Sequence, residues 1–513
     1  MSHQIAERRG PAAARLETSQ HLLFHSPSVC SIWGVSRNWW DVTGTDMTGQ
    51  EMLTWGPSMR WVLRLIETGM PSGVSGVDVM EISRPDGASN IADLGLTLSE
   101  AKQLLACVQQ AIVAAQAGDL AARRPECSSC SGRCHVNGRR CHLLATPFGK
   151  VTVQLPRFRC VSCGHIERCV TWPSHCRSTP ELDRLRAHLS ALMPFRVAAD
   201  VLTHLLPADV GMSPETLRAH TLKIGEQLGD IPTAKPVAAA MSITVTTDST
   251  FIRSCEAGNR HLEVRVGNVE TSDGGRQVFG AVARSNTDIA VQIRRSLEAV
   301  GGTAATKVTA FTDGCPGLRS ILADAGVTTR PIADWFHIAM RLQHAKLAAS
   351  GLLTDEPGRK EAKATIVTEV ERLHWRIWNG KAKNAQKTFD RIRKVMHLYK
   401  GERGHRTRGV ASRKLWHALH EIDKYLRSQS TRLVNYAARY RAGMRVGTAV
   451  TEGTANFLVN RRMNKSQQRR WSRRGANLVL QVRCAVYNGT LGSGFGQRFD
   501  PIGRPDVTVK IAA

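Results

Sequence analysis

The sequence lacks long apolar runs: nowhere do 18 or more apolar residues follow one another. Because a transmembrane helix needs about 20 consecutive, predominantly apolar residues, the sequence predicts no membrane span. The first 25 residues also lack a continuous apolar stretch followed by small residues, which is unlike a secretory signal peptide. We therefore expect a cytoplasmic protein.

Acidic residues are scarce relative to basic ones. The chain has 70 Lys and Arg against 43 Asp and Glu, a formal net charge of +27. Residues 381–480 alone hold 25 Lys and Arg against five Asp and Glu, so about 20 of the 27 net charges fall in this stretch. The imbalance predicts a polyanionic partner, and its concentration in one region is unlike a ribosomal protein, which is usually short and basic throughout.

At 513 residues the chain is too long for one ordinary hydrophobic core. Its 42% hydrophobic and 22% charged residues are typical of a globular protein and exclude a disordered or collagen-like chain. Composition and periodicity divide the chain into eight segments. The first is an N-terminal region (1–95) that is partly disordered, above all in residues 1–45. It is followed by a helix (96–125), a Cys-rich module (126–178), a three-helix domain (179–235), the first part of a sheet domain (236–349), a helical insertion (350–445), the second part of the sheet domain (446–490) and a tail (491–513).

Helical signals precede the sheet domain in two places. Residues 98–123 keep helical spacing, with Thr97 and Glu100 spaced as a capping box, and this helix serves packing or self-association. Three shorter helices are expected at 181–193, 195–206 and 214–228. The last carries Arg218 and Lys223, so the unit is either a helix-turn-helix that binds DNA or a purely structural bundle.

Between residues 243 and 332 the pattern changes to the alternation that is typical of strands. We expect strands at 243–251, 262–266, 277–284, 307–312 and 328–332, with helices at 287–300 and 316–325. This β-β-β-α-β-α-β order predicts an α/β (α+β) mixed sheet flanked by helices, and it matches the ribonuclease-H-like fold. Residues 334–444 have helical spacing and form the insertion.

Three carboxylates are candidates for a catalytic site. Asp248 interrupts the first expected strand, Asp313 ends the fourth, and Glu452 opens a helix after the insertion. If the two strands are neighbours, both aspartates meet at one end of the sheet. Cleavage of a phosphodiester and strand transfer require two oxygens to be stabilised together, which two Mg²⁺ about 3.5–4 Å apart can do when held by hard oxygen ligands. A strand-end Asp is more often a turn residue or a helix cap, so placement on the fold carries this hypothesis.

Eight of the 13 cysteines fall between Cys127 and Cys176, which in a reducing compartment predicts a metal site before disulfides. The pairs Cys127-x-x-Cys130 and Cys160-x-x-Cys163 have the spacing of a zinc ribbon, so we expect one structural Zn²⁺. A closed four-Cys site leaves no position open for catalysis, and its role is folding and DNA docking. Substitute ligands, or ligands of a second metal, are Cys134, Cys141, Cys169, Cys176, His135 and His165.

Basic residues after Glu452 predict a phosphate-binding surface, because few acids stand near them in the sequence. The alternative is a solvated helix face. The surface comprises Arg461, Arg462, Lys465, Arg469, Arg470, Arg473 and Arg474, with Trp471 among them. A second candidate surface comprises Arg391, Arg393, Lys394, Arg403, Arg406 and Arg408.

Four stretches, at 146–164, 311–318, 333–337 and 451–456, carry a resemblance to a known family. The last stretch, Thr-Glu-Gly-Thr-Ala-Asn, continues through Lys465-Ser466-Gln467-Gln468 and Trp471 to Gly475-Ala476-Asn477 and Gln481-Val482-Arg483. Over roughly residues 95–490 the chain resembles the DDE insertion-sequence transposases of the Kra type, which are related to the broader ISL group.

The resemblance implies Mg²⁺-dependent cleavage at transposon ends, with Mn²⁺ able to substitute, and attack of a 3′-hydroxyl on target DNA. It carries Asp248, Asp313 and Glu452 over as the ligands of two Mg²⁺, and it implies a homodimer or higher homo-oligomer on double-stranded DNA in the bacterial nucleoid. Asp334 and His337 resemble an Asp-x-x-His signature that contacts metal or DNA, although a capping Asp and a packed His explain them equally well. Two other functions stay open: a transposase-derived protein that binds DNA without cutting it, and a ribonuclease-H-like nuclease of another pathway.

Overall fold

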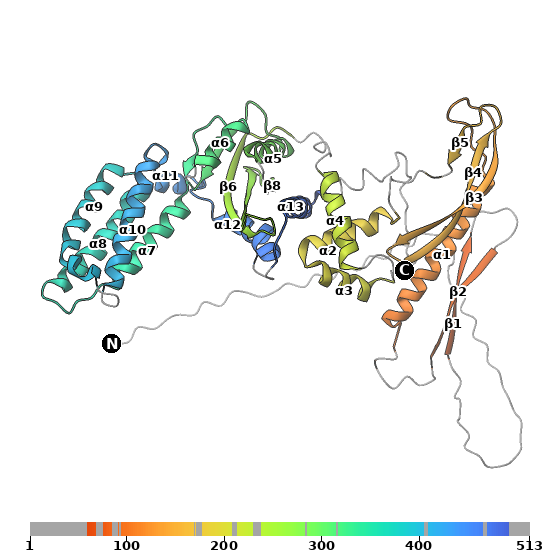
Figure 1. Cartoon of the computed structure of the whole chain (residues 1–513), viewed down its shortest axis with the longest axis horizontal. Coiled ribbons are helices and arrows are strands. Elements are labelled where there is room, and N and C mark those ends of the chain that lie inside the picture. Colours follow the sequence, from red (N-terminus) through yellow and green to blue (C-terminus); the bar gives the residue numbers. More distant parts are fainter. Residues whose placement is uncertain are drawn as a thin grey trace, which may run out of the picture. The chain divides into compact units, whose positions relative to one another are not determined.

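The computed structural model describes residues 59–67, 75–84, 91, 94–168, 170, 177–207, 213–228, 238–282, 285–313, 316–404, 409–464 and 469–491. The chain divides into two compact units, Met1–Ala122 and Arg123–Ala513 (Figure 1). The expectations for residues 1–45, for Lys465 and for Cys169 and Cys176 lie outside the described residues.

The first unit contains a β-hairpin that the sequence did not predict. Strands β1 (Met59–Glu67) and β2 (Ser75–Arg84) pair antiparallel, and helix α1 (Leu98–Ala122) packs against β2. The predicted capping box is confirmed, because Glu100 N donates to Thr97 Oγ1 at 3.2 Å and Thr97 N donates to Glu100 Oε2 at 2.8 Å. The Arg84 guanidinium also donates to both Glu100 oxygens, which lowers the pKa of Glu100 to about 2.

Among the described helices, only α1 has the length and composition of a membrane-spanning helix. None of its residues is buried in the structure. It carries Glu100, Lys102 and Asp119, and a helix of this composition can equally pack inside a protein, so the finding weighs little against the expectation of no membrane span.

The Cys-rich module is a three-stranded antiparallel sheet in the order β3-β4-β5. Strands β3 (Cys134–Thr146) and β4 (Gly149–Cys160) form a long hairpin, and β5 (Ile166–Arg168) pairs with the end of β4. At the hairpin turn, Phe148 N donates to Thr146 Oγ1 at 3.0 Å, and Gly149 adopts a φ of 116°. Residues 151–155, between the two cysteine pairs, lie within β4.

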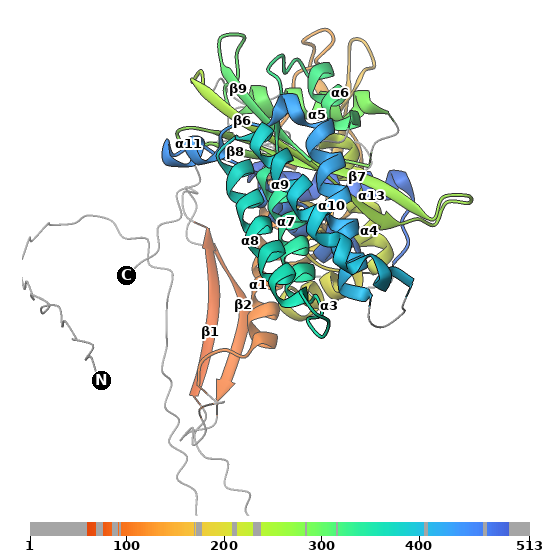
Figure 2. The same cartoon turned by 90° about the vertical axis from the view of Figure 1, so that its left-hand side faces the viewer.

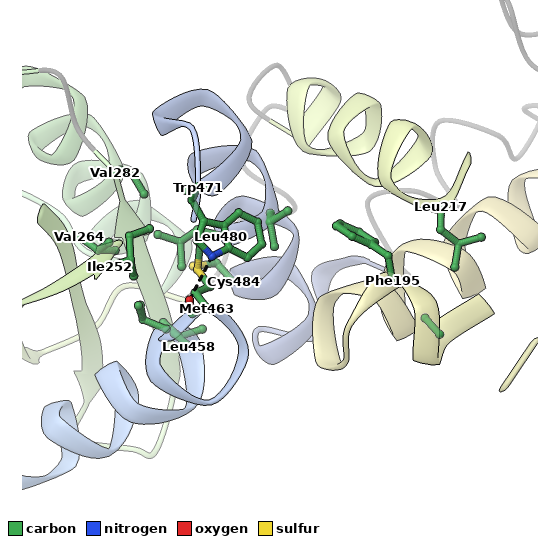
Figure 3. Close-up of a cluster of buried hydrophobic side chains, with 14 of the residues drawn as sticks. Phe195, Leu217, Ile252, Val264, Val282, Leu458, Met463, Trp471, Leu480 and Cys484 are labelled. Carbon is green, nitrogen blue, oxygen red and sulfur yellow. Dashed lines mark hydrogen bonds between the residues drawn. The ribbon is translucent and has the colours of Figure 1, made fainter. Parts of the chain in front are cut away.

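The three predicted helices after this module are confirmed as α2 (Pro180–Leu192), α3 (Phe195–Leu205) and α4 (Pro214–Leu228). Their apolar faces share one core with the sheet domain, in which Phe195 and Leu217 belong to the same buried cluster as Val264 (Figure 3). Helix α4 lies so close to α13 (Arg473–Tyr487) that a Cβ at Gly225 would stand 2.5 Å from the Leu478 carbonyl oxygen. These contacts agree with the structural-bundle alternative.

A five-stranded mixed sheet forms the centre of the second unit, in the order β10-β9-β6-β7-β8. Its strands are β6 (Ser242–Arg253), β7 (His261–Thr271), β8 (Arg276–Ala281), β9 (Lys307–Thr312) and β10 (Ile332–Ala333). The first three form an antiparallel meander, and β9 and β10 run parallel to β6. The predicted succession of elements is confirmed, but the fifth strand was placed wrongly. It begins only after Pro331, which has no N–H to donate to a neighbouring strand.

The two faces of the sheet pack against different helices because residues alternate along each strand. On one face Ile243 and Val245 contact α5 (Asn286–Ala299) and α6 (Pro316–Asp324). On the other face Ile252, Val264 and Val266 contact α12 (Ala449–Ala455), the following π-helix η4 (Asn456–Asn464) and α13 (Figure 3). Asp248 is an even-numbered residue of β6, like Ile252, so it belongs to this second face.

The π-helix η4 has an identifiable cause in the buried Arg483 of α13. Arg483 Nε donates to the Leu458 carbonyl at 2.5 Å, and its Nη2 donates to the Phe457 carbonyl. These two carbonyls therefore accept hydrogen bonds from outside their own helix. They no longer need the backbone N–H four residues later, which an α-helix would supply.

The segment between β10 and α12 is almost wholly helical, as predicted. It contains α7 (Trp335–Ser350), α8 (Arg359–Trp378), α9 (Ala382–Val395), the 3₁₀ segments η2 (Met396–Gly404) and η3 (Ser430–Arg432), α10 (Val410–Ser428) and α11 (Tyr436–Arg441). Figure 2 shows α7, α8, α9 and α10 alongside one another. Their apolar faces enclose a core of their own, which includes Ile366, Leu373, Leu415 and Leu419.

Candidate functional site

The register of the sheet sets Asp248 and Asp313 side by side. Strands β6 and β9 pair in parallel as far as Thr246 and Phe311. Asp248 and Asp313 each stand two residues beyond that pair, so they occupy equivalent positions, at the level where β9 ends and β6 continues without it to Arg253. Parallel strands present their carboxyl ends at the same edge, which is where open sheets bind ligands.

Asp334 extends this row to the next strand. The pairing of β9 with β10 ends at Thr312 and Ala333, so Asp313 and Asp334 directly follow the last pair. Asp334 N donates to the Thr312 carbonyl at 3.1 Å, which continues the alignment. Three aspartates thus stand at the same level of neighbouring parallel strands: Asp248 within β6, Asp313 just after β9 and Asp334 just after β10.

The Asp334 carboxylate is fully buried and already holds several donors. Its Oδ1 accepts from Phe336 N at 2.9 Å, which caps α7, and from Thr448 N at 2.8 Å. Its Oδ2 accepts from Thr448 Oγ1 and lies 3.6 Å from His337 Nε2. A Cβ at Gly447 would stand 2.6 Å from Oδ1, so only a glycine permits this close approach. Asp334 is therefore a cap that also fixes the start of α12, the helix that carries Glu452.

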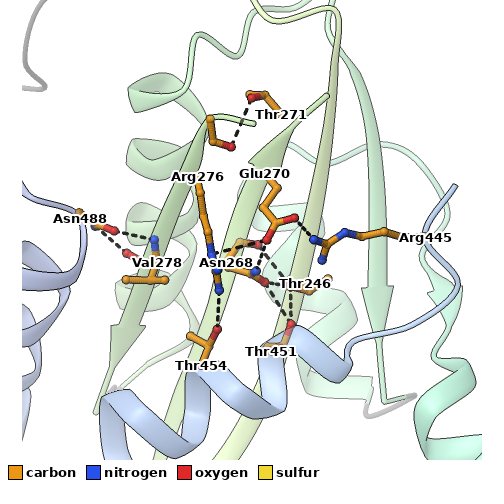
Figure 4. A network of polar contacts seen from close by, with 11 residues as sticks. Thr246, Asn268, Glu270, Thr271, Arg276, Val278, Arg445, Thr451, Thr454 and Asn488 are labelled. Carbon is orange, nitrogen blue, oxygen red and sulfur yellow. Dashed lines mark hydrogen bonds and ion pairs between the residues drawn. The ribbon is translucent and has the colours of Figure 1, made fainter. Parts of the chain in front are cut away.

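A second contact fixes α12 across β6. Thr451 Oγ1 lies 2.5 Å from Thr246 Oγ1 and 3.1 Å from Asn268 Oδ1, and all three residues are buried (Figure 4). Buried polar groups of this kind are costly unless each finds a partner, so the network specifies one position for the helix.

The same polar network continues along β7 and β8 (Figure 4). Asn268 Nδ2 donates to Glu270 Oε1 at 3.0 Å, and Glu270 pairs with both Arg276 and Arg445. Arg276 Nη2 in turn donates to Thr454 Oγ1 at 3.4 Å, one turn of α12 after Thr451. Helix α12 is thus bonded to three strands of the sheet.

Asp248 lies on the face of β6 that α12 and η4 cross. Thr246 and Thr250, two residues before and after it, point to the same face. Thr246 bonds Thr451 of α12, and Thr250 Oγ1 lies 3.4 Å from Asn460 Oδ1 of η4. The two contacts bracket Asp248 between the helix that carries Glu452 and its continuation.

The pKa of Asp248 reflects its burial first and its charged neighbours second. Burial is the largest effect, and it raises the pKa of Asp248 above its ordinary value. The Ser249 amide donates to Asp248 Oδ1 at 2.7 Å and lowers this pKa, as does the charge of His337. The negative charges of Asp313 and Asp334 raise it. A cation bound beside Asp248 would favour its ionised form.

Glu452 is on the expected helix but its side chain is exposed. Across the described ranges, the four cysteines below are the only group of three or more His, Cys, Asp or Glu whose ligand atoms all lie within 4.8 Å of one another. The oxygens of Asp248, Asp313 and Glu452 therefore do not form so tight a group. The strand register aligns Asp248 with Asp313. Glu452 follows Thr451, whose hydroxyl contacts Thr246 of β6, two residues before Asp248.

Two residues near the aspartates were missed by the sequence analysis. Arg341 Nη1 donates to the His337 carbonyl at 3.0 Å, and its guanidinium lies 4.3 Å from the centre of the Tyr425 ring. Burial raises the pKa of Tyr425, which Arg341 lowers and the charges of Asp334 and Asp313 raise. The spacing of His337 and Arg341, one turn apart on α7, was the available signal, but the position of Tyr425 depends on how α10 packs.

The four predicted zinc ligands do come together. Cys130 Sγ lies 3.5 Å from Cys160 Sγ and 3.4 Å from Cys163 Sγ, and Cys127 Sγ lies 3.5 Å from Cys163 Sγ. All four sulfurs are within 4.8 Å of one another, close enough to hold a metal such as zinc.

The loops around these sulfurs are shaped by glycine and by backbone donors. A Cβ at Gly132 would stand 3.1 Å from Cys160 Sγ and 3.2 Å from Cys130 Sγ, so the loop closes onto the sulfurs. The backbone amide of Cys163 lowers the pKa of Cys160 to about 6. The Gly132 amide lowers the pKa of Cys130. The neighbouring thiols outweigh this effect and raise the pKa of Cys130 to about 12. A bound cation removes this conflict by stabilising every thiolate.

The substitute ligands that the structure describes do not belong to the group of four sulfurs. Cys134 is buried beside the group, where burial raises its pKa, and Cys141 is exposed on β3. His165 pairs with Glu167 at 3.6 Å. In the part of the chain that the structure describes, neither these residues nor His135 join the four-sulfur group.

Two members of the expected phosphate-binding surface are buried. Arg462 is 4% exposed and Trp471 is 9% exposed. Arg462 Nε donates to the Ser190 carbonyl at 3.1 Å and its guanidinium lies 5.0 Å from the Phe195 ring, whereas Trp471 Nε1 donates to the Met463 carbonyl (Figure 3). This corrects the expectation that both line phosphates, because tertiary packing has placed them between the helices and the sheet.

Other members of this surface have acidic partners from distant parts of the sequence. Arg473 N donates to Glu256 Oε1 at 2.6 Å, and Arg474 pairs with Glu226. The prediction that these arginines lack acidic partners, because few acids stand near them in the sequence, is therefore wrong for Arg473 and Arg474. Arg461, Arg470 and Arg218 are exposed, and Arg469 and Lys223 are half-buried. In the second surface Arg391 and Arg393 pair with Glu369 and Asp423, Lys394 is exposed, and Arg406 and Arg408 lie outside the described residues.

Comparison with known proteins gives no relative: no protein-family model matches the chain, and no curated protein matches it.

Proposed function

We propose that this protein is a DNA transposase of the DDE type, which cleaves DNA at transposon ends and joins them to target DNA. The observation that carries the proposal is the register of β6 and β9, which aligns Asp248 with Asp313 where the pairing of these adjacent parallel strands ends. Helix α12, which bears Glu452, is bonded across the same strand through Thr451 and Thr246.

The order of the sheet supports a ribonuclease-H-like core for this proposal. Such a core has an antiparallel three-strand meander followed by two parallel strands on the far side of the first strand, and this chain has β8-β7-β6 followed by β9 and β10. The helical segment between β10 and α12 is then an insertion between the second and third carboxylates.

Each carboxylate has a separate role in the proposal. Asp248, Asp313 and Glu452 would hold two Mg²⁺, or Mn²⁺, and these ions would stabilise the attacking and leaving oxygens of the phosphodiester. Asp334 is a positioning residue, because its oxygens already accept from Phe336 and Thr448. His337 Nε2 lies 3.6 Å from Asp334 Oδ2, and the charge of His337 lowers the pKa of Asp248, which favours its ionised form.

The remaining parts of the chain have supporting roles. We propose that the four cysteines hold one structural Zn²⁺ that folds the β3-β4-β5 module for docking on double-stranded DNA. Arg461, Arg470 and Arg218, which are exposed, are the retained phosphate-binding candidates. We further propose a homodimer or higher homo-oligomer, since two transposon ends must be held together, acting in the bacterial cytoplasm at the nucleoid.

The test is metal-dependent nicking of DNA that carries the ends of the element, with the full-length chain. We expect Asp313→Asn and Glu452→Gln to lose at least about a hundredfold in rate, because a metal site supplies several kcal/mol to such a reaction. Asp390→Asn is the matched control, an exposed aspartate on α9.

Three outcomes separate the alternatives. Nicking that is unchanged in Asp313→Asn and Glu452→Gln contradicts the assigned site. Binding of the ends without nicking, by the wild-type protein with Mg²⁺ or Mn²⁺, indicates a transposase-derived DNA-binding protein. Nicking without strand joining indicates a nuclease of another pathway.

A further inference from the structure

A groove of about 800 Å³ runs between α7 and α10 of the helical insertion. Small residues make part of its floor, namely Ala348 and Gly351 from the end of α7 and Ala411 and Ala418 from α10. A Cβ at Gly351 would stand 3.4 Å from the Ala411 Cβ, so the helices approach closely here. Larger side chains at these positions would fill the groove.

The rim of the groove is exposed and predominantly basic. Lys414 and the imidazoles of His344 and His417 are exposed along it, and Leu347 adds an apolar side chain that is 62% exposed. Glu421 is the one acid among the lining residues. An apolar floor with the positive charges of Lys414 and Arg341 at its edge suits a ligand that has flat apolar groups and negative charge.

One end of the groove approaches the aspartates. Arg341 lines the groove and donates through Nη1 to the His337 carbonyl at 3.0 Å. His337 Nε2 in turn lies 3.6 Å from Asp334 Oδ2. The groove therefore begins about two turns of α7 after Asp334, which stands at the edge of the sheet beside Asp313.

The Tyr425 hydroxyl lies at this junction without a partner. Arg341 covers the Tyr425 ring at 4.3 Å, and within the described residues the hydroxyl is buried and makes no hydrogen bond. A buried hydroxyl without a partner is unfavourable, but Tyr425 is not among the residues that line the groove, so only Arg341 connects the two.

We propose that the α7–α10 groove binds a single DNA strand that leads away from the carboxylates, with its phosphates on the basic rim and its bases on the small-residue floor. The inference rests on the proposed function and names the part of the substrate that this groove takes. A gap between two packed helices is too narrow for a duplex, and its continuity with Arg341 and His337 favours the reacting strand over a protein segment.

Photo-crosslinking on the full-length protein tests this directly. Replacing Leu347 with p-benzoylphenylalanine places a crosslinker in the groove, and replacing Trp375, which is 54% exposed on α8, gives the control. With a labelled single-stranded oligonucleotide we expect a protein–DNA adduct at Leu347 and none at Trp375. An adduct between two copies of the chain, an adduct only with duplex DNA, or no adduct at Leu347 overturns the proposal.

A salt titration of oligonucleotide binding, without divalent cations, supplies a second measurement. Lys414→Ala should reduce the dependence of log K on log salt by about 0.7, equivalent to about fivefold weaker binding at 0.1 M salt, because one phosphate contact is lost. Lys387→Ala, an exposed lysine on α9, is the matched control and should change neither quantity. A slope for Lys414→Ala equal to that of the wild-type protein contradicts the proposed contact.

The two proposals fail in different ways. If the wild-type protein nicks transposon ends but Leu347 gives no DNA adduct, the groove assignment is wrong and the transposase proposal stands. If single-stranded DNA enters the groove but no DNA is cut with Mg²⁺ or Mn²⁺, the catalytic proposal fails alone.

Discussion

Removing the Asp334 carboxylate should loosen α12 without removing a metal ligand. In Asp334→Ala the first turn of α7 loses its cap, and Thr448 loses the acceptor of both its amide and its hydroxyl. Since Asp334 is fully buried, water cannot readily replace these bonds. We expect the start of α12 to open more often and Glu452 to be held less firmly.

The magnitude follows from the bonds that are lost. A missing helix cap costs about 0.5–2 kcal/mol, and each buried donor left without a partner costs about 1–3 kcal/mol. The two Thr448 donors alone amount to roughly 2–6 kcal/mol, which corresponds to amide exchange that is about 30-fold to about 25,000-fold faster where opening governs exchange. Hydrogen exchange of a peptide that contains Thr448, followed by mass spectrometry, measures this.

A second cap provides the control. Asn435 caps α11 by accepting from Ala438 N at 2.9 Å, but it has no bond to α12. Asn435→Ala should cost about 0.5–2 kcal/mol and leave exchange at Thr448 unchanged. If Asp334→Ala also leaves that exchange unchanged, Asp334 does not fix α12 and its positioning role is refuted. If the Mg²⁺ concentration for half-maximal nicking rises steeply in Asp334→Ala with α12 intact, Asp334 is a ligand instead.

Three further predictions concern the rest of the molecule. Metal analysis should find about one zinc per chain and its loss in Cys127→Ser, and full metal content in that variant would reject the ligand set. The folded state raises the pKa of Asp248, so the protonated carboxyl contributes stability that is fully present below the unfolded pKa and is lost as the pH rises through the folded pKa. Without divalent cations, Asp248→Asn should therefore have a higher melting temperature than the wild-type protein at pH 7, but not near pH 3. Equal melting temperatures at both pH values would contradict the burial argument. Gly225→Ala should destabilise the α4–α13 contact by about 1–3 kcal/mol in urea unfolding, because its Cβ would meet the Leu478 carbonyl, whereas Gly118→Ala in α1 has open space and should stabilise the chain by up to about 1 kcal/mol.

The sequence predicted the sheet well because its strands alternate strongly. The bounds of β9 were found to the residue and those of β6 to within two, and these strands decide where Asp248 and Asp313 stand. The weaker predictions have physical reasons. Strand β10 has only two residues after Pro331, and its hydrogen bonds depend on β9 more than on its own pattern.

Burial of charged and aromatic residues could not be predicted from spacing. Arg462 and Trp471 stand in a run of basic residues, and nothing in that run shows that Ser190 and Phe195 pack against the arginine. Likewise, Glu226 and Glu256 lie more than 200 residues from the arginines that they bond. Local sequence reports the composition of a surface, whereas ion pairs and burial depend on contacts between distant segments.

The anchoring of Glu452 was also beyond the sequence. Thr448 and Thr451 are ordinary residues by pattern, yet they bond Asp334 and Thr246 and so set the position of α12. The sequence could name Asp334 as a cap or as a ligand, but only the geometry around Thr448 distinguishes the two.

The most direct test of the account is an anomalous scattering map of crystals of the full-length protein soaked in Mn²⁺. We expect two peaks about 3.5–4 Å apart beside Asp248, Asp313 and Glu452, where the pairing of β6 with β9 ends. No manganese at this edge of the sheet, or manganese bound by other residues, would contradict the assignment of these three carboxylates.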